Sequence, residues 1–516
     1  MVKGNIFCGI AFNYHDSSVS FAENGNISLV LEAERVFRKK KMRCSSDEME
    51  KLVNIGLNEI GKDIDDISYW ALATLENPWL SAEEKRPNPP FWKDVNLMGG
   101  KRRSLIVNHH LSHAASFLFS PFQRAKIITC DGGGDYGERV AIYRGEGNNI
   151  TKEEMDVRNF VTAKPYDLCS TYLYNSPMCE GKLMALAAYG EPSSKYLSKL
   201  EELLSELCTT NYEMGDKLLS MAFPELKGSA SAQNADSCDF AASLQELFVR
   251  KRMGDLNNIV NEDLTQNLVL AGGACLNLEV NTEIWKQFPK SPTFIPPCCD
   301  DTGQSVGALA YLITEVLGTR PILSLPYLGI GRESFEFSEN DLDGLVNSLL
   351  NNEIILVHNG KAEIGPRALG NRSFISRPDN NRVREIVSQK IKKRESYRPL
   401  APVVIEEKVN DYFIGPEKSP FMLHQYGFVS DSMADNLIGC KHYNKTARAQ
   451  TINKKTNPFL YELIKRFGER TGLYVLLNTS LNLRGEPISN IFEQTISISN
   501  RIEQNHRTVY NGAVVK

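Results

Sequence analysis

The chain of 516 residues is long enough for several domains of ordinary size and a large hydrophobic core. Apolar residues make up 42% and charged residues 24% of it, which excludes a disordered, collagen-like or fibrous protein. No run approaches the roughly 18 apolar residues of a membrane span. The 11 cysteines include no C-x-x-C pair, and the start of the chain has no small-residue cleavage site. We therefore expect reduced thiols, a cytoplasmic location and no contact with membranes.

One pattern of elements occurs twice near the start of the chain. Its first copy has apolar or alternating segments at 6–12, 17–22 and 27–31, with an Asn24-Gly25 turn before the third. The second copy has corresponding segments at 127–130, 139–143 and 150–155. Asp16 and Asp131 each follow the first strand of their copy. This duplication resembles the plan of the superfamily of actin, sugar kinases and heat-shock chaperones, and the resemblance implies that the two Asp-bearing hairpins hold nucleotide phosphates and a metal.

Further elements complete an α/β pattern. A strand is expected at 268–270, followed by the Gly272-Gly273 turn and a helix at about 276–286. Such a turn presents free backbone N–H groups that suit a phosphate. A helix is expected at 304–317, and the Pro- and Gly-containing stretch 320–331 is interpreted as a linker. We therefore predict two domains, 1–330 and 331–516.

Histidines and carboxylates suggest a metal site. His109 and His113 are four residues apart, so on a helix both imidazoles would lie on one face. Asp131 and Asp301 follow strands at turns that the duplicated fold would bring to its cleft. Two histidines with one or two carboxylates suit iron(II), manganese or zinc. The alternatives are core or capped histidines and a helix-capping role for Asp301.

Positive charge is concentrated in one segment. Residues 361–400 contain eleven Lys and Arg against four Asp and Glu, a net charge of +7, whereas the chain as a whole carries −4. The cations are interleaved with Gly, Pro and Asn, which favours a built anion site over a solvated helix face. Guanidinium groups hold phosphates in bidentate geometry, and Ser, Thr and Asn groups complete such sites. RNA binding is the rival, but only Phe374 and Tyr397 are near as stacking platforms.

An ordered set of motifs resembles one family over nearly the whole chain, the O-carbamoyltransferases of antibiotic and nodulation-factor biosynthesis, such as the tobramycin, novobiocin and cephem enzymes. The motifs are His109-His-Leu-Ser-His113, Asp131-Gly-Gly-Gly-Asp135, Gly181-Lys182-Leu-Met184, Ala271-Gly272-Gly273-Ala-Cys-Leu-Asn277, Asp301-Thr-Gly303, Glu363-Ile-Gly-Pro-Arg367 and Asn478-Thr-Ser480-Leu-Asn482.

The resemblance implies a fold and an activity. The N-terminal domain would be actin-like (ASKHA), similar to the iron-holding tRNA threonylcarbamoyltransferase subunit, and the C-terminal domain would be YrdC-like. Carbamoyl phosphate and ATP, with Mg²⁺, would give carbamoyl-adenylate in the C-terminal domain. The N-terminal domain would transfer the carbamoyl group to a hydroxyl of a secondary metabolite. The acceptor is expected to be a hydroxylated small molecule and not a nucleic acid. A monomer and a homodimer both remain open.

The resemblance also assigns residues. His109, His113, Asp131 and Asp301 match the family's metal positions, with Fe²⁺ or another divalent ion expected. His15 and Asp16 match the motif on the acceptor and metal side, and His15 is the candidate base because imidazole titrates near neutral pH. The expected phosphate and nucleotide positions are Lys182, Gly272, Gly273, Asn277, Arg367, Lys392, Arg398, Ser480 and Asn482. The front and rear sites are expected to be two anion pockets.

Three other functions are compatible with parts of this pattern. A tRNA threonylcarbamoyl-modification enzyme would need a basic RNA-binding surface, yet the chain outside 361–400 is net acidic. A non-catalytic nucleotide-binding assembly protein would not need Arg367, Lys392, Arg398 and Ser480 together. A sugar kinase would form ADP, whereas the carbamoyltransferase reaction forms AMP and pyrophosphate.

Overall fold

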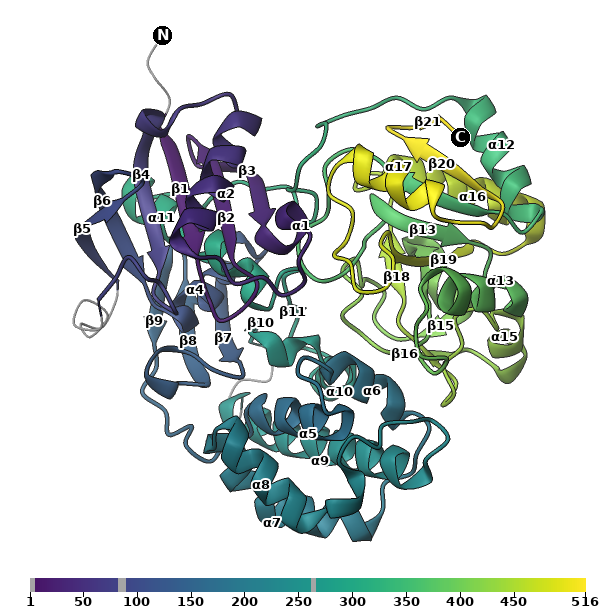
Figure 1. The fold of residues 1–516 in the computed structure, drawn as a ribbon, viewed down its shortest axis with the longest axis horizontal. Helices are drawn as coiled ribbons and strands as arrows, with labels where there is room; N and C mark the ends of the chain where they lie inside the picture. The colour runs from purple at the N-terminus through teal and green to yellow at the C-terminus, as the bar shows by residue number, and fades with distance from the viewer. Residues whose placement is uncertain (1–4, 82–89, 261–265) are drawn as a thin grey trace.

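The computed structural model describes residues 5–81, 90–260 and 266–516. It is a mixed α/β structure, which confirms the predicted class. Within these ranges the strands form sheets of six, five, seven and three strands. Figure 1 shows the first two large sheets in the N-terminal part of the chain and the seven-stranded sheet in the C-terminal part.

The first two sheets share one strand order. The six-stranded sheet runs β5-β6-β4-β1-β2-β3 and the five-stranded sheet runs β11-β10-β7-β8-β9, so β1 corresponds to β7 and β4 to β10, and β5 is an extra edge strand. In each sheet, the first strand pairs antiparallel with the next strand of its meander and parallel with a later strand. This arrangement matches the duplication predicted from the sequence. The strands are β1 (Ile6–Ala11), β2 (Ser18–Glu23), β3 (Asn26–Glu32), β4 (Ile67–Ala73), β5 (Phe91–Leu97), β6 (Gly100–Val107), β7 (Arg124–Cys130), β8 (Val140–Glu146), β9 (Asn149–Lys152), β10 (Leu268–Ala271) and β11 (Thr293–Phe294).

Two helices join these sheets. Helix α11 (Gln304–Leu317) packs on β1 and β4, and α4 (His109–Ala114) packs on β7 and β10. The helices touch each other where a Cβ on Gly307 would lie 1.8 Å from Ser112 O. Only a glycine allows this approach, so the close contact fixes the end of α4 relative to the start of α11.

The remaining N-terminal helices form two groups, one beside the first sheet and one at the end of the second. Helix α1 (Ala33–Phe37) follows β3, and α2 (Ser46–Glu59) packs on β2 and β3 behind a Ser45 capping box. A group of helices gathers at the end of the second sheet (Figure 1). These helices are α5 (Lys164–Tyr174), α6 (Glu180–Ala187), α7 (Ser194–Thr209), α8 (Tyr212–Ala222), α9 (Ala235–Val260) and α10 (Leu278–Gln287).

The C-terminal part is built on the seven-stranded sheet, in the order β18-β14-β19-β13-β12-β20-β21. Helices α12 and α16 bury one apolar face of it, while a second core fills the opposite face. The strands are β12 (Ile354–His358), β13 (Arg372–Ser376), β14 (Ala401–Ile405), β18 (Gln450–Ile452), β19 (Val475–Ser480), β20 (His506–Tyr510) and β21 (Ala513–Val514). The helices are α12 (Glu339–Leu350), α13 (Asn381–Glu385), α14 (Val409–Tyr412), α15 (Asp431–Asn436), α16 (Pro458–Thr471) and α17 (Phe492–Asn500). The small sheet comprises β15 (Phe413–Ile414), β16 (Tyr426–Phe428) and β17 (Thr446–Ala447).

Two general expectations can be compared with this fold. All 11 cysteines are unpaired and buried, as the scattered pattern predicts. Across the described ranges, no helix has the length and apolar character that crossing a membrane requires. The domain boundary near residue 330 stays a prediction.

Candidate active site

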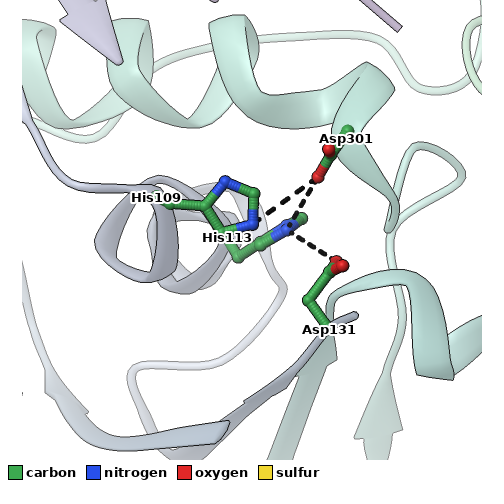
Figure 2. A group of neighbouring side chains, drawn as sticks. All are labelled: His109, His113, Asp131 and Asp301. Atoms are coloured by element: carbon green, nitrogen blue, oxygen red, sulfur yellow. Dashed lines mark ion pairs between the residues drawn. The ribbon is translucent and has the colours of Figure 1, made fainter. Parts of the chain in front are cut away.

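Four side chains form a buried group at the junction of the first two sheets. His109 and His113 lie one turn apart on α4, Asp131 follows β7, and Asp301 precedes α11 (Figure 2). Asp301 Oδ1 lies 3.6 Å from His109 Nε2 and 3.5 Å from His113 Nε2, and Asp131 Oδ2 lies 3.3 Å from His113 Nε2. One ligand atom from each residue lies within 4.8 Å of the others. The structure therefore brings the four predicted metal ligands together.

The chemistry of this group fits a divalent cation. Both ring nitrogens of His109, His113 Nε2 and Asp301 Oδ1 are buried and make no hydrogen bond. Such unsatisfied groups are rare in protein interiors because their desolvation is costly. A set of two imidazoles and two carboxylates is typical of transition-metal sites. These residues therefore fit a divalent metal ion.

The pKa values of the group show the same need for positive charge. Burial lowers the pKa of His113, but the carboxylates of Asp131 and Asp301 outweigh burial and raise it to about 9. Burial, and then the charge of Asp131, raise the pKa of Asp301. The two carboxylates thus repel each other and draw a proton to His113, and a bound cation would relieve both effects.

Backbone groups hold these ligands in place. Asp131 Oδ2 accepts a hydrogen bond of 2.7 Å from the Gly273 amide, and the Gly272 amide donates to Cys299 O at 2.6 Å. Gly272 has φ 98°, and a Cβ there would lie 2.2 Å from Cys130 O. The Gly272-Gly273 turn therefore supports a ligand of the metal group, and its predicted role in phosphate binding stays a prediction.

His15 and Asp16 lie beside the metal group. His15 Nδ1 is 2.8 Å from Asp16 Oδ2 and 4.0 Å from Asp301 Oδ2, and Lys41 Nζ donates to Asp16 Oδ2 at 2.6 Å. Although burial opposes it, the hydrogen bond to Asp16 and the charge of Asp301 raise the pKa of His15 to about 9. The pKa of His15 is therefore raised chiefly by its hydrogen bond to Asp16, and only in part by the charge of Asp301 that a bound cation would offset. The sequence indicated both residues but gave no sign of Lys41.

A cavity of about 1130 Å³ lies between the N-terminal and C-terminal parts. Asp16, Lys41 and Thr302, which neighbour the metal group, line one side of it. The basic segment of the C-terminal part lines the other side. The four residues of the metal group do not themselves line this cavity, so the expectation of two anion pockets stays a prediction.

Five arginines of the C-terminal part line this cavity, and four of them form a cluster: Arg367, Arg394, Arg398 and Arg448. The Nε atoms of Arg367 and Arg448 are buried without a hydrogen-bond partner. Burial and the neighbouring Arg398 lower the pKa of Arg394 to about 9. Glu395, 3.6 Å from Arg398, carries the acidic charge that partly compensates the cluster. Such crowded, unsatisfied guanidinium groups suit a phosphorylated ligand.

Lys392 organises the turn beside these arginines. A segment of π-helix, Ile386–Ile391, ends directly before it, and its side chain is buried. Its Nζ donates to Ser480 Oγ at 3.1 Å and to Asn482 O at 2.7 Å, and it also contacts Ser480 O and Asn482 Oδ1. Arg394 donates to Ser480 Oγ at 3.4 Å. The predicted residues Lys392, Ser480 and Asn482 therefore form one unit at the cavity wall.

The other predicted nucleotide positions have structural partners. Lys182 Nζ lies 3.0 Å from Glu395 Oε1, so this ion pair joins the two parts of the chain across the cavity. Asn277 caps α10 and exchanges hydrogen bonds of 3.0 and 3.1 Å with Gln245. The binding roles of Lys182 and Asn277 stay predictions.

Arg394 and Arg448 were not among the residues predicted from the sequence. Arg394 lies within the basic run from Lys392 to Arg398, so charge density alone could have indicated it. Arg448 lies between β17 and β18, outside any basic run, and reaches the cluster because β18 pairs with β14. No local signal marks a residue that strand pairing places in this way.

Some solved structures share a weak likeness with the chain. The activator of 2-hydroxyisocaproyl-CoA dehydratase from Clostridium difficile, with bound ADPNP, aligns with 61% of this chain and 96% of its own at 11% identity and a TM-score of 0.38. Full-length HypF, in a phosphate- and nucleotide-bound form, aligns with 61% of this chain and 56% of its own at 12% identity and a TM-score of 0.36.

Two family models and several relatives match most of the chain in sequence. Residues 92–310 match the family model described as carbamoyltransferase N-terminus, and residues 346–516 match carbamoyltransferase C-terminus. An uncharacterised protein of Methanocaldococcus jannaschii is 30% identical over 92% of this chain and 93% of its own length. Nodulation protein NolO of Bradyrhizobium diazoefficiens is 30% identical over 74% of each chain, and the 3'-hydroxymethylcephem-O-carbamoyltransferase of Amycolatopsis lactamdurans is 28% identical over 60% of each. The chain therefore belongs to the carbamoyltransferase family and is a carbamoyltransferase.

Proposed function

We propose that this carbamoyltransferase is an ATP-dependent O-carbamoyltransferase that modifies a hydroxyl group of a small secondary metabolite. The observation that carries the proposal is the cavity, which has the arginine cluster on one wall and approaches the metal group on the other. An activated intermediate made at the arginine wall would cross this cavity to the side near the metal group.

The arginine wall suits the activation of carbamoyl phosphate. Arg367, Arg394 and Arg448 would bind its phosphate, and water would release inorganic phosphate to leave carbamate. The carbamate oxygen would then attack the α-phosphorus of ATP, giving carbamoyl-adenylate while Mg²⁺-bound pyrophosphate leaves. Preorganised cations stabilise the charge that develops on the phosphoryl oxygens.

The opposite wall suits the transfer step. The acceptor oxygen would attack the carbamoyl carbon, AMP would leave, and the hydroxyl proton would pass to a base, for which His15 is the candidate. His109, His113, Asp131 and Asp301 would hold a divalent ion, with Fe²⁺ as the expected metal. When bound there, that ion supplies positive charge that polarises a carbonyl or neutralises an adenylate phosphate.

The proposal includes the fold of each part. The shared strand order of the first two sheets supports an actin-like (ASKHA) assignment for the N-terminal part. For the C-terminal part we propose a YrdC-like fold, with the arginine cluster as its ligand site.

Product analysis tests this function. The protein, ATP and carbamoyl phosphate, incubated without an acceptor, should give pyrophosphate and carbamoyl-adenylate, and AMP should form only when an acceptor is added; ion-exchange chromatography separates these nucleotides from ADP. Omitting carbamoyl phosphate should abolish pyrophosphate. Arg394→Ala should reduce pyrophosphate release at least about tenfold because it removes a charged ligand of the phosphate, while Arg382→Ala, at an exposed position, should not. Formation of ADP as the nucleotide product would contradict the proposal.

A further inference from the structure

The segment from the last residue of β3 through α1, residues 32–41, lies on the side of the N-terminal part that faces the C-terminal part (Figure 1). We call it the α1 segment because α1 forms its centre. It carries no residue of the metal group or the arginine cluster. Its side chains nevertheless contact the loops that carry residues of both walls of the cavity.

Glu32 and Arg35 hold the loop that leads to Arg367. Arg35 Nε lies 2.8 Å from Glu32 Oε2, and both side chains are buried. The other Glu32 oxygen accepts a hydrogen bond of 2.7 Å from the Gly365 amide, and Arg35 donates to Glu363 O and Gly365 O. This buried ion pair from the N-terminal part thus binds the main chain two residues before Arg367.

Arg38 holds a second loop of the C-terminal part. Its guanidinium donates to Ile488 O at 2.6 Å and to Pro487 O at 2.8 Å. This loop follows Asn482, which Lys392 contacts at the cavity wall. Arg38 itself ends α1 in a left-handed conformation, with φ 61°, so the chain turns there and aims its side chain at this loop.

The same segment ends at the metal side. Lys41, three residues after Arg38, donates to Asp16 beside His15. One short stretch of chain therefore contacts both loops of the anion wall and the residues next to the metal group. In contrast, the contacts among Lys392, Arg394 and Ser480 lie within the C-terminal part.

We propose that Arg35 and Arg38 are positioning residues that clamp these two loops to the N-terminal part, so that the activated intermediate stays in the shared cavity until transfer. The inference rests on the proposed function, because it concerns carbamoyl-adenylate. The proposal distinguishes two properties. The C-terminal part alone builds the anion wall, whereas Arg35 and Arg38 hold that wall in place next to the side of the cavity near the metal group.

Retention of the intermediate tests the clamp. The full chain would be mixed with ¹⁴C-labelled carbamoyl phosphate and ATP without an acceptor, then passed rapidly through a desalting column. We expect labelled adenylate to elute with the wild-type protein. In Arg38→Ala, pyrophosphate release should stay within about twofold of wild type, while retained label falls about tenfold through the loss of two charged hydrogen bonds. Arg38→Lys, which can reach one carbonyl, should restore part of the retention.

The chain offers a matched control in Arg320. This arginine also donates to main-chain carbonyls, Phe122 O at 2.6 Å and Gly147 O at 2.6 Å, but both lie within the N-terminal part. Arg320→Ala should therefore retain label as the wild type does. Arg38→Gln is the second variant if Arg38→Ala does not fold, and thermal unfolding checks each protein.

The outcomes separate the two proposals. If the wild-type protein releases no pyrophosphate, both the proposed function and the clamp are refuted. If it does, but Arg38→Ala retains label as well as wild type, only the clamp is refuted. A parallel loss of pyrophosphate release and retention in Arg38→Ala would also refute the clamp, because the residue would then belong to the activation step.

Discussion

Lys392 Nζ and the main-chain oxygen of Asn482 lie 2.7 Å apart at the wall of the cavity, and the lysine side chain is buried. Its ammonium group is therefore committed to shaping the turn that presents Ser480. Burial lowers the pKa of Lys392 well below its usual value, and the neighbouring Arg394 lowers it further. The lysine thus has a structural role in the turn and loses its proton more readily than an exposed lysine.

Lys392→Met should slow pyrophosphate release from ATP and carbamoyl phosphate about a hundredfold, because the turn at Ser480 loses its organising donor. Transfer from supplied carbamoyl-adenylate should change little. Lys390→Met, at an exposed position nearby, is the control. Equal losses in both half-reactions would argue against placing activation at this wall.

Arg448→Ala should raise the KM for carbamoyl phosphate about tenfold to a hundredfold, because the arginine cluster loses a charged ligand for the phosphate. The KM for ATP should change less. Steady-state pyrophosphate release measures both constants. An unchanged KM for carbamoyl phosphate would remove Arg448 from the binding site.

His113→Ala should lose the bound divalent ion, because its Nε2 faces both Asp131 and Asp301. Metal content after purification and dialysis can be measured by mass spectrometry. His110→Gln is the matched control, because His110 is engaged with Thr129 and Glu138 O rather than with the group. The same metal content in wild type and His113→Ala would disprove this ligand.

Gly307→Ala should destabilise the protein by about 1–3 kcal/mol and weaken metal binding, because its Cβ would push α11 away from Ser112. Gly344 lies in α12 with nothing within 4 Å of a Cβ, so Gly344→Ala should be neutral or stabilising by up to about 1 kcal/mol. Chemical unfolding compares the two. Comparable stability of the two variants would show that the helices can separate without cost.

Acid should destabilise the fold through His442. Burial lowers the pKa of this side chain to about 4. Between about pH 6.5 and pH 4 the unfolded chain binds the proton more readily, so stability falls as the pH falls, by about 2 kcal/mol at pH 5. Unfolding free energies at pH 5 and 7.5 should differ less in His442→Gln than in wild type. An equal difference would assign the acid effect to other groups.

Local patterns predicted the parts of the site that depend on local structure. The expected helix at 304–317 agrees with α11, which ends at the left-handed Gly318, and the four-residue spacing of His109 and His113 places both on α4. The turns after β7 and before α11 bring Asp131 and Asp301 to them. Here sequence spacing and strand order sufficed, because each ligand sits at the end of a regular element.

Other features depend on contacts between distant segments. Arg38 binds carbonyl oxygens about 450 residues away, and a main-chain oxygen leaves no signature in the sequence. The Gly272-Gly273 turn has the composition of a phosphate loop, yet the amide of Gly273 donates to Asp131. A glycine pattern predicts the turn, but the partner of its amides depends on the neighbouring strand.

Gly365 presses its main chain against Pro297, so closely that a Cβ would lie 2.1 Å from Pro297 O. The loop leading to Arg367 and the loop leading to Asp301 therefore touch through their main chains, with no room for a side chain between them. If the proposed function holds, a shift of Asp301 on metal loading would move the loop that leads to Arg367, and we expect removal of the metal to change the affinity for carbamoyl phosphate.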